Sequence, residues 1–161
     1  MSRSTAAKRT LDSFDRAILR ILQRDNKTPQ RRIGEAVNLS AAAVQRRIAA
    51  MEEAGIIARN VAVVDTHAVA MTITSIVEVQ MINEHQQTAD AARALFQATP
   101  EVQQCYYVTG GISFVLVIVA PDMPSYEALT RRLFNENQAV ANFRSLIALD
   151  RVKTGSEIVI P

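Results

Sequence analysis

Apolar residues recur at helical spacing through the first third of the chain and predict three helices. The first covers Leu11–Arg24. The stretch Gln30–Ile57 then holds two more, and in the second of these Val44, Ile48 and Met51 form one buried stripe. The pattern therefore predicts a small helical bundle at the N-terminus.

The junction between the second and third helices has the residues of a sharp corner. Asn38 tolerates the left-handed conformation of a helix exit, and Ser40 is suited to cap the next helix. Leu39 between them is expected to plug the corner, and Gly55 follows the last apolar turn, where a C-terminal glycine belongs. This combination predicts a helix-turn-helix, a motif that places its second helix in the DNA major groove.

Beyond Gly55 the pattern changes from helical to β-branched. The run IIARNVAVV predicts a short strand or wing, so we expect a winged helix-turn-helix over residues 11–64. Residues 65–70 are then the linker, and residues 71–161 a second domain.

The second domain alternates strand-like and helical segments in the order β-α-β-β-α-β. Strands are predicted at 72–82, 102–108, 113–119 and 140–149, helices at 86–98 and after Asp122, and a short terminal strand at 157–160. This order indicates an α+β chain whose C-terminal part is a ferredoxin-like βαββαβ sandwich. Right-handed crossovers place both helices on one face of the sheet and leave the other face bare.

The segment Phe114–Val119 is apolar at every position, which is typical of a strand covered on both sides. Helices of one subunit cover only one side. A second subunit laid sheet against sheet would cover the other, so the pattern predicts a homodimer that presents two reading helices to DNA.

Charge is divided unevenly along the chain. Residues 1–60 carry a net +6 and residues 61–161 a net −4. The basic charge therefore lies with the helix-turn-helix, as binding to double-stranded DNA requires.

Composition places further limits on the chain. Its single cysteine, Cys105, excludes an intramolecular disulfide and is expected to be a small buried residue. The first residues lack the apolar core of a signal peptide, and no apolar run approaches the ~18 residues of a membrane span. We expect a cytoplasmic protein without membrane association, in which residues 1–10 form a disordered basic arm.

The helix predicted at 41–54 presents small and polar residues opposite its apolar stripe. Arg and Gln there are suited to pair with guanine and adenine. Basic residues that open the preceding helix are suited to hold phosphates. The candidate DNA contacts are Gln30, Arg31, Arg32, Ser40, Ala42, Gln45, Arg46 and Arg47. Of these, Arg47 lies nearer the core and is expected to pack its stem on the neighbouring helix, with its head on a phosphate or a carboxylate. The alternative is an ordinary helical hairpin with a solvated charged face.

Several segments resemble the Lrp/AsnC (leucine-responsive, feast/famine) family over nearly the whole chain. They are LDSFDRAILRILQRD, VNLSAAAVQRRIAAMEEAGII, QCYYVTGG and APDMPSY, in the order and spacing of the family. The resemblance implies an N-terminal winged helix-turn-helix and a C-terminal amino-acid-sensing domain that builds dimers and often octamers. It also implies a transcriptional regulator.

The chain departs from this family at the implied effector pocket. Family members usually carry aspartates where Gly111 and Ser113 stand, and threonines where Phe143 and Ser145 stand. The resemblance leaves as effector-binding candidates Thr109, Gly110, Gly111, Ser113 and Ser145. An ammonium group would lose its charge partners here, so we expect weak or no response to leucine and similar neutral amino acids, with either constitutive DNA binding or a different ligand. A plain tight turn is an equally good account of the two glycines.

Two rival functions share this architecture. Siroheme decarboxylases resemble the same domain pair, but the second domain is acidic and holds only His67 and His85. No catalytic set, metal-ligand spacing or cofactor motif stands out, so we expect no enzyme activity. The other rival is a regulatory subunit that binds a small molecule and acts on a partner enzyme. The basic reading helix argues against it.

Overall fold

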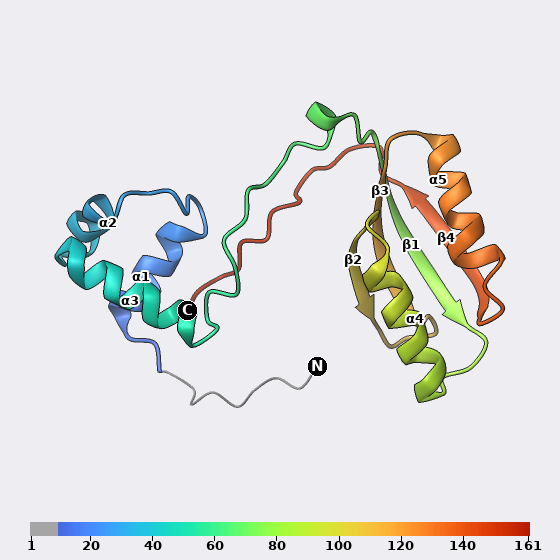
Figure 1. Cartoon of the computed structure of the whole chain (residues 1–161), viewed down its shortest axis with the longest axis horizontal. Helices are drawn as coiled ribbons and strands as arrows, with labels where there is room; N and C mark the ends of the chain where they lie inside the picture. The colour runs from blue at the N-terminus through green and yellow to red at the C-terminus, as the bar shows by residue number, and fades with distance from the viewer. Residues whose placement is uncertain (1–9) are drawn as a thin grey trace. The chain divides into compact units, whose positions relative to one another are not determined.

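The computed structural model describes residues 10–161, which form two compact units (Figure 1). One unit runs to Ala62 and also includes Thr154–Pro161, and the other is Val63–Lys153. The basic arm expected at the N-terminus lies outside the described residues, except for Thr10. Each unit has its own hydrophobic core, so each is described by itself.

The N-terminal unit is the expected three-helix bundle. Its helices are α1 (Ser13–Leu22), α2 (Gln30–Val37) and α3 (Ala41–Glu53). Apolar side chains from all three helices are buried at its centre: Ile18, Ile33, Val37, Val44 and Met51. The helical spacing of these positions in the sequence is the reason that each helix buries one face.

The corner between α2 and α3 has the predicted geometry. Asn38 adopts the left-handed conformation with φ 57°. The Ser40 hydroxyl accepts a hydrogen bond from the backbone N–H of Ala43 at 3.2 Å, which caps α3. Gly55 follows α3 with φ 68°, a value that glycine adopts without strain. These findings confirm the helix-turn-helix.

The β-branched run does not form the short strand or wing that the sequence predicted. Residues 56–64 form no regular structure, and Ile56 and Ile57 instead pack half-buried against the helical core. A strand needs a partner for its backbone groups, and no described segment pairs with this one. Only the first apolar residues of the run, Ile56 and Ile57, therefore contribute to packing against the core.

The terminal strand expected at 157–160 is also absent from the described residues. The backbone of Ile158 instead exchanges two hydrogen bonds with the Gln23 side chain, at 2.9 and 3.2 Å. Gln23 is the C-cap of α1, and Arg20 within that helix donates to the carbonyl of Ile160. The tail, expected within the second domain, thus belongs to the N-terminal unit because α1 supplies its hydrogen-bond partners.

The C-terminal unit has the predicted βαββαβ order around one antiparallel sheet (Figure 1). A short 3-10 turn, η1 (His67–Val69), precedes it. The elements of the sandwich are β1 (Ile73–Met81), α4 (Gln86–Ala98), β2 (Val102–Tyr107), β3 (Phe114–Ala120), α5 (Met123–Thr130), the π-helical segment η2 (Arg131–Asn135) and β4 (Val140–Ile147). The strand order is β2-β3-β1-β4, so the two central strands are β3 and β1.

Both helices cover the same face of this sheet. Val77 of β1 pairs with Leu116 of β3, and both side chains are fully buried in a core with Phe96 of α4 and Leu129 of α5. The next position on each strand faces the other way, and Val117 there is only partly buried. The predicted one-sided coverage is therefore confirmed.

Cys105 is exposed, so its expected burial is wrong. It lies on β2, an edge strand that has a neighbour on one side only. The pKa of its thiol is raised by partial desolvation, which disfavours the thiolate.

Among residues 10–161, no helix is long and apolar enough to cross a membrane.

Candidate functional site

The outer face of α3 carries three of the predicted DNA contacts. Ala42, Gln45 and Arg46 are all exposed, whereas Val44 and Met51 on the opposite face have no exposed surface. The Arg46 side chain has no hydrogen bond or ion pair with any described residue. The helix therefore presents a small residue, an amide and a guanidinium together to solvent.

The first turn of α2 is exposed and basic. Gln30, Arg31 and Arg32 are exposed there. Arg31 forms an ion pair with Glu35 one turn later, with its Nε 3.1 Å from Oε1. Both side chains are well exposed, so this pair is weak and leaves Arg31 able to reach a phosphate.

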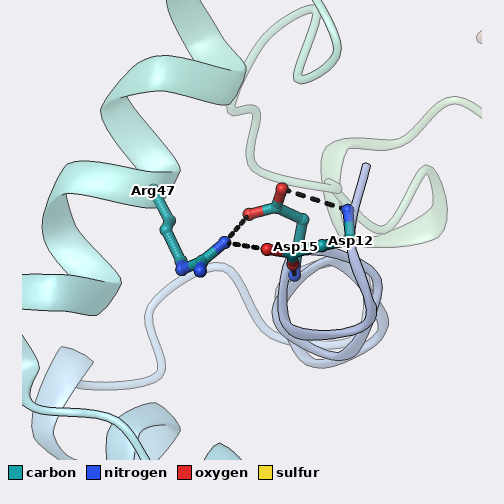
Figure 2. A network of polar contacts seen from close by, with 3 residues as sticks. All are labelled: Asp12, Asp15 and Arg47. Atoms are coloured by element: carbon teal, nitrogen blue, oxygen red, sulfur yellow. Dashed lines mark hydrogen bonds and ion pairs between the residues drawn. The ribbon is translucent and has the colours of Figure 1, made fainter. Parts of the chain in front are cut away.

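Arg47 points inward, toward α1 (Figure 2). Its Nη1 lies 2.7 Å from Oδ2 of Asp12 and 2.8 Å from Oδ1 of Asp15. Its guanidinium also lies over the Phe14 ring, 5.4 Å from the ring centroid. The sequence left open whether the Arg47 head binds a phosphate or a carboxylate, and in the structure it binds carboxylates. Arg47 thus connects α3 to α1.

The two carboxylates that receive Arg47 also begin α1. The Asp12 side chain accepts from the Asp15 backbone N–H at 2.8 Å, and the Asp15 side chain accepts from the Asp12 backbone N–H in return. This capping box satisfies free N–H groups of the first turn. The Asp15 N–H, and then Arg47, hold the pKa of Asp12 below its usual value.

Gly34 allows α2 to lie close to the backbone of Leu39 in the corner between α2 and α3. The sequence analysis did not single out this glycine. A Cβ at this position would lie 2.4 Å from the Leu39 carbonyl oxygen, too close for any side chain. The Gly34 carbonyl also accepts the Leu39 N–H at 2.9 Å. The only signal in the sequence is a glycine four residues before Asn38, and a glycine near the end of a helical pattern is equally typical of a helix C-terminus.

The second candidate site is the turn between β2 and β3. The Val108 N–H donates to the Ser113 carbonyl at 3.0 Å and closes the turn. Gly110 and Gly111 have φ values of 110° and 92°, which only glycine adopts without strain. Both are exposed, together with Thr109. The predicted turn is thus confirmed, and its backbone is accessible to a ligand.

A carboxylate that the sequence analysis missed lies at the base of this turn. Glu84, between β1 and α4, accepts from the Ser113 hydroxyl at 2.9 Å with Oε1 and from the Tyr107 hydroxyl at 2.9 Å with Oε2. The bond to Glu84 raises the pKa of Tyr107. The Tyr107 ring in turn carries the Arg93 guanidinium, 4.4 Å from its centroid. Gly111 and Ser113 bring no carboxylate to this turn, but Glu84 from a distant segment does.

Ser145 does not join this turn. On the β4 side of β1 it pairs with Val77, and its hydroxyl bonds to the buried Tyr126 hydroxyl, which also contacts Ser75. Ser113 lies on the β3 side, where its hydroxyl accepts from the Met81 N–H. The two serines, grouped by the sequence analysis, thus belong to separate hydrogen-bond networks, and Ser145 is tied to the core.

The two histidines are not assembled into a site. His67 and His85 are both exposed, in segments before and after β1. Within residues 10–161, no group of three His, Cys, Asp or Glu side chains is placed to hold a metal ion.

Comparison with protein families agrees with both units. The family described as the AsnC-type helix-turn-helix domain matches residues 11–52. The family described as the Lrp/AsnC ligand binding domain matches residues 74–158.

Individual proteins match over nearly the whole chain. A helix-turn-helix transcriptional regulator of Haemophilus influenzae is 38% identical over 151 residues, which cover 94% of this chain and 90% of the relative. The crystal structure of an AsnC family regulator from Agrobacterium tumefaciens is 30% identical, with a TM-score of 0.86 over 92% of this chain and 97% of that one. A regulator from Neisseria meningitidis, solved as a complex with L-methionine, is 23% identical. It has the same fold, with a TM-score of 0.87 over 93% of this chain and 97% of that one.

Proposed function

Because this chain belongs to the Lrp/AsnC family of helix-turn-helix transcriptional regulators, we propose that it reads specific DNA with the outer face of α3. The observation that carries this proposal is the exposed set Ala42, Gln45 and Arg46 on a helix whose other face buries Val44 and Met51 completely. Arg46 is suited to a bidentate contact with guanine, and Gln45 to one with adenine. The methyl group of Ala42 lets the helix approach the bases closely.

Phosphate contacts come from the start of α2 in this proposal. Gln30, Arg31 and Arg32 are exposed in its first turn, where free backbone N–H groups also favour an anion. Ser40 caps the N-terminus of α3 and is a further phosphate contact in this proposal. Arg47, which the sequence analysis included among the DNA contacts, is not part of this proposal, because its guanidinium is paired with two carboxylates.

We propose that two chains pair through the uncovered face of the sheet. Four partly buried or exposed apolar side chains gather there on three neighbouring strands: Ile76, Val115, Val117 and Leu146. A salt bridge of 2.7 Å between Arg144 and Glu78 borders them. Water contact with such a surface is unfavourable, and an identical face would cover it in a two-fold dimer.

We propose that the effector is a small molecule with an ammonium and a carboxylate group, held at the turn of residues 109–113. Each oxygen of Glu84 accepts one hydrogen bond within the protein, and an ionised carboxylate accepts more. Glu84 is thus placed to receive the ammonium group, and the accessible N–H groups of Gly110 and Gly111 to bind the carboxylate. The methionine complex of the Neisseria regulator supports an amino acid.

Selection of genomic fragments by the purified protein tests the DNA proposal. A bound fragment then serves to compare two variants with the unmodified chain. Arg46→Ala should cost about 1–3 kcal/mol on the selected site and relax its base preference. Arg31→Ala should weaken binding to specific and random DNA alike and flatten the salt dependence. Equal losses on both DNAs for Arg46→Ala would contradict its reading role, and failure to retard any fragment would favour a regulatory subunit.

A further inference from the structure

A hollow in the C-terminal unit lies on the helix side of the sheet, and Met81 in its lining donates its backbone N–H to the Ser113 hydroxyl of the turn site. It is a groove of about 510 Å³ lined by α4, the end of β1 and the segment after η2. Met81, Ala92 and Ala139 form apolar parts of its lining, with Leu95 on α4. Its volume falls within the range of small-molecule sites.

The polar part of the groove consists of Gln87, Thr88, Arg132 and Asn137, all of which carry hydrogen-bond donors. Arg132 is the one charged lining residue, and its side chain forms no hydrogen bond or ion pair with a described residue. The Asn137 side-chain oxygen accepts from the Ala139 N–H at 3.0 Å, which leaves its NH₂ group available to donate. A guanidinium and an amide NH₂ on one apolar groove suit a carboxylate.

Arg132 lies in the π-helical segment that interrupts the end of α5. The Glu136 N–H bonds to the Arg131 carbonyl at 2.9 Å, five residues back, so one extra residue is accommodated in this turn. Such turns are rare and occur frequently at functional sites. Arg131, the preceding residue, pairs with Glu127 on α5, whereas Arg132 remains available to the groove.

We propose that this groove binds a monocarboxylate with a branched or aromatic apolar body. No acidic residue lines it, so an ammonium group would have no charge partner there. The groove therefore discriminates against free amino acids and favours acids that lack the amine. None of the lining residues of the groove belongs to the effector proposal, which depends on Glu84 and the turn.

Calorimetry on the full chain with isocaproate and with phenylacetate tests the proposal, with isoamylamine as the cationic control. Isocaproate or phenylacetate should bind saturably, and isoamylamine should not. Arg132→Gln should weaken binding roughly tenfold or more, because it removes the charge-assisted bonds. Arg131→Gln is the matched control in the same segment and should leave binding unchanged.

A second variant tests the location without altering charge. Ala91 lines the groove and is exposed on α4, so Ala91→Phe should fill the groove and block the ligand while the core stays intact. The proposal is overturned if neither acid binds saturably, if Arg132→Gln binds as well as Arg131→Gln, or if Ala91→Phe retains full affinity.

Discussion

Nη1 of Arg47 on the recognition helix lies 2.8 Å from Oδ1 of Asp15 on α1, whose side chain is only 2% exposed (Figure 2). The same guanidinium nitrogen contacts Asp12, the residue that caps α1. One side chain therefore connects the cap of the first helix to the middle of the third. This connection holds α3, which carries the proposed DNA-reading face, against α1.

We expect Arg47→Gln to lower the free energy of unfolding of the N-terminal unit by about 1–3 kcal/mol, because its loss removes a charged partner from the buried Asp15 carboxylate. Urea unfolding followed by amide signals of α1–α3 measures this change. Arg46→Gln is the control on the same helix: it should leave stability within about 0.5 kcal/mol and weaken DNA binding. A stable Arg47→Gln protein with weakened DNA affinity would reassign Arg47 to the DNA contact surface.

The capping interactions of Asp12 should appear in the pH dependence of stability. The pKa of this carboxyl lies below its usual 3.8, first because of the Asp15 N–H and then because of Arg47. A lowered pKa in the folded state means that the contribution is present above the unfolded value of 3.8 and is lost as the pH falls through the folded value. The stability advantage of the unmodified chain over Asp12→Asn should therefore shrink below about pH 4. An advantage that is constant from neutral pH to about pH 3 would contradict this account.

Gly34→Ala should destabilise the helix-turn-helix despite the higher helix propensity of alanine. The new Cβ would meet the Leu39 carbonyl oxygen at 2.4 Å and force the corner apart. We expect a net loss of about 1–2 kcal/mol, with weaker DNA binding because α3 shifts relative to α2. Gly155→Ala has open space around the new Cβ and serves as the neutral control. Equal melting temperatures for the two variants would show that the corner can relax.

Adjacent lysine substitutions on β3 should have different consequences. Val117 faces the uncovered side of the sheet, so Val117→Lys should yield folded monomers in sedimentation analysis. Ile118 is fully buried beneath the helices, so Ile118→Lys should unfold the domain. The unmodified chain should sediment as a dimer or a multiple of it, such as an octamer. A dimer that survives Val117→Lys would place the interface elsewhere.

Glu84→Gln should reduce affinity for a free amino acid roughly tenfold or more, because the amide cannot pair with an ammonium group. It keeps the size of the side chain and leaves an oxygen for Ser113 or Tyr107. Asp90→Asn is the matched control, since Asp90 is an exposed carboxylate on the neighbouring α4 that pairs with Arg93. Calorimetry with L-methionine and L-leucine measures the difference. No binding of either amino acid to the unmodified chain would instead support the expectation drawn from Gly111 and Ser113.

Local patterns in the sequence were sufficient for most of the elements and their order. Helix spacing, Asn38, Ser40 and Gly55 act within one or two turns of the backbone, so they predicted the helix-turn-helix correctly. The alternation of strands and helices likewise predicted the sandwich and its one-sided coverage. The wing and the terminal strand failed because β-branched residues favour extended backbone but do not supply a pairing partner.

Contacts between distant segments were decided only by the tertiary structure. Residues 84 and 113 come together because β3 pairs with β1, and nothing in either local sequence predicts that Glu84 will accept a hydrogen bond from Ser113. The partner of Arg47 and the contact of the C-terminal tail with the N-terminal unit could not be predicted from the sequence for the same reason. Apolar periodicity determines which face of an element is buried, since burial lowers the free energy of that element anywhere in a core. The choice of polar partners depends on directional bonds a few ångströms long, and these exist only once the chain is folded.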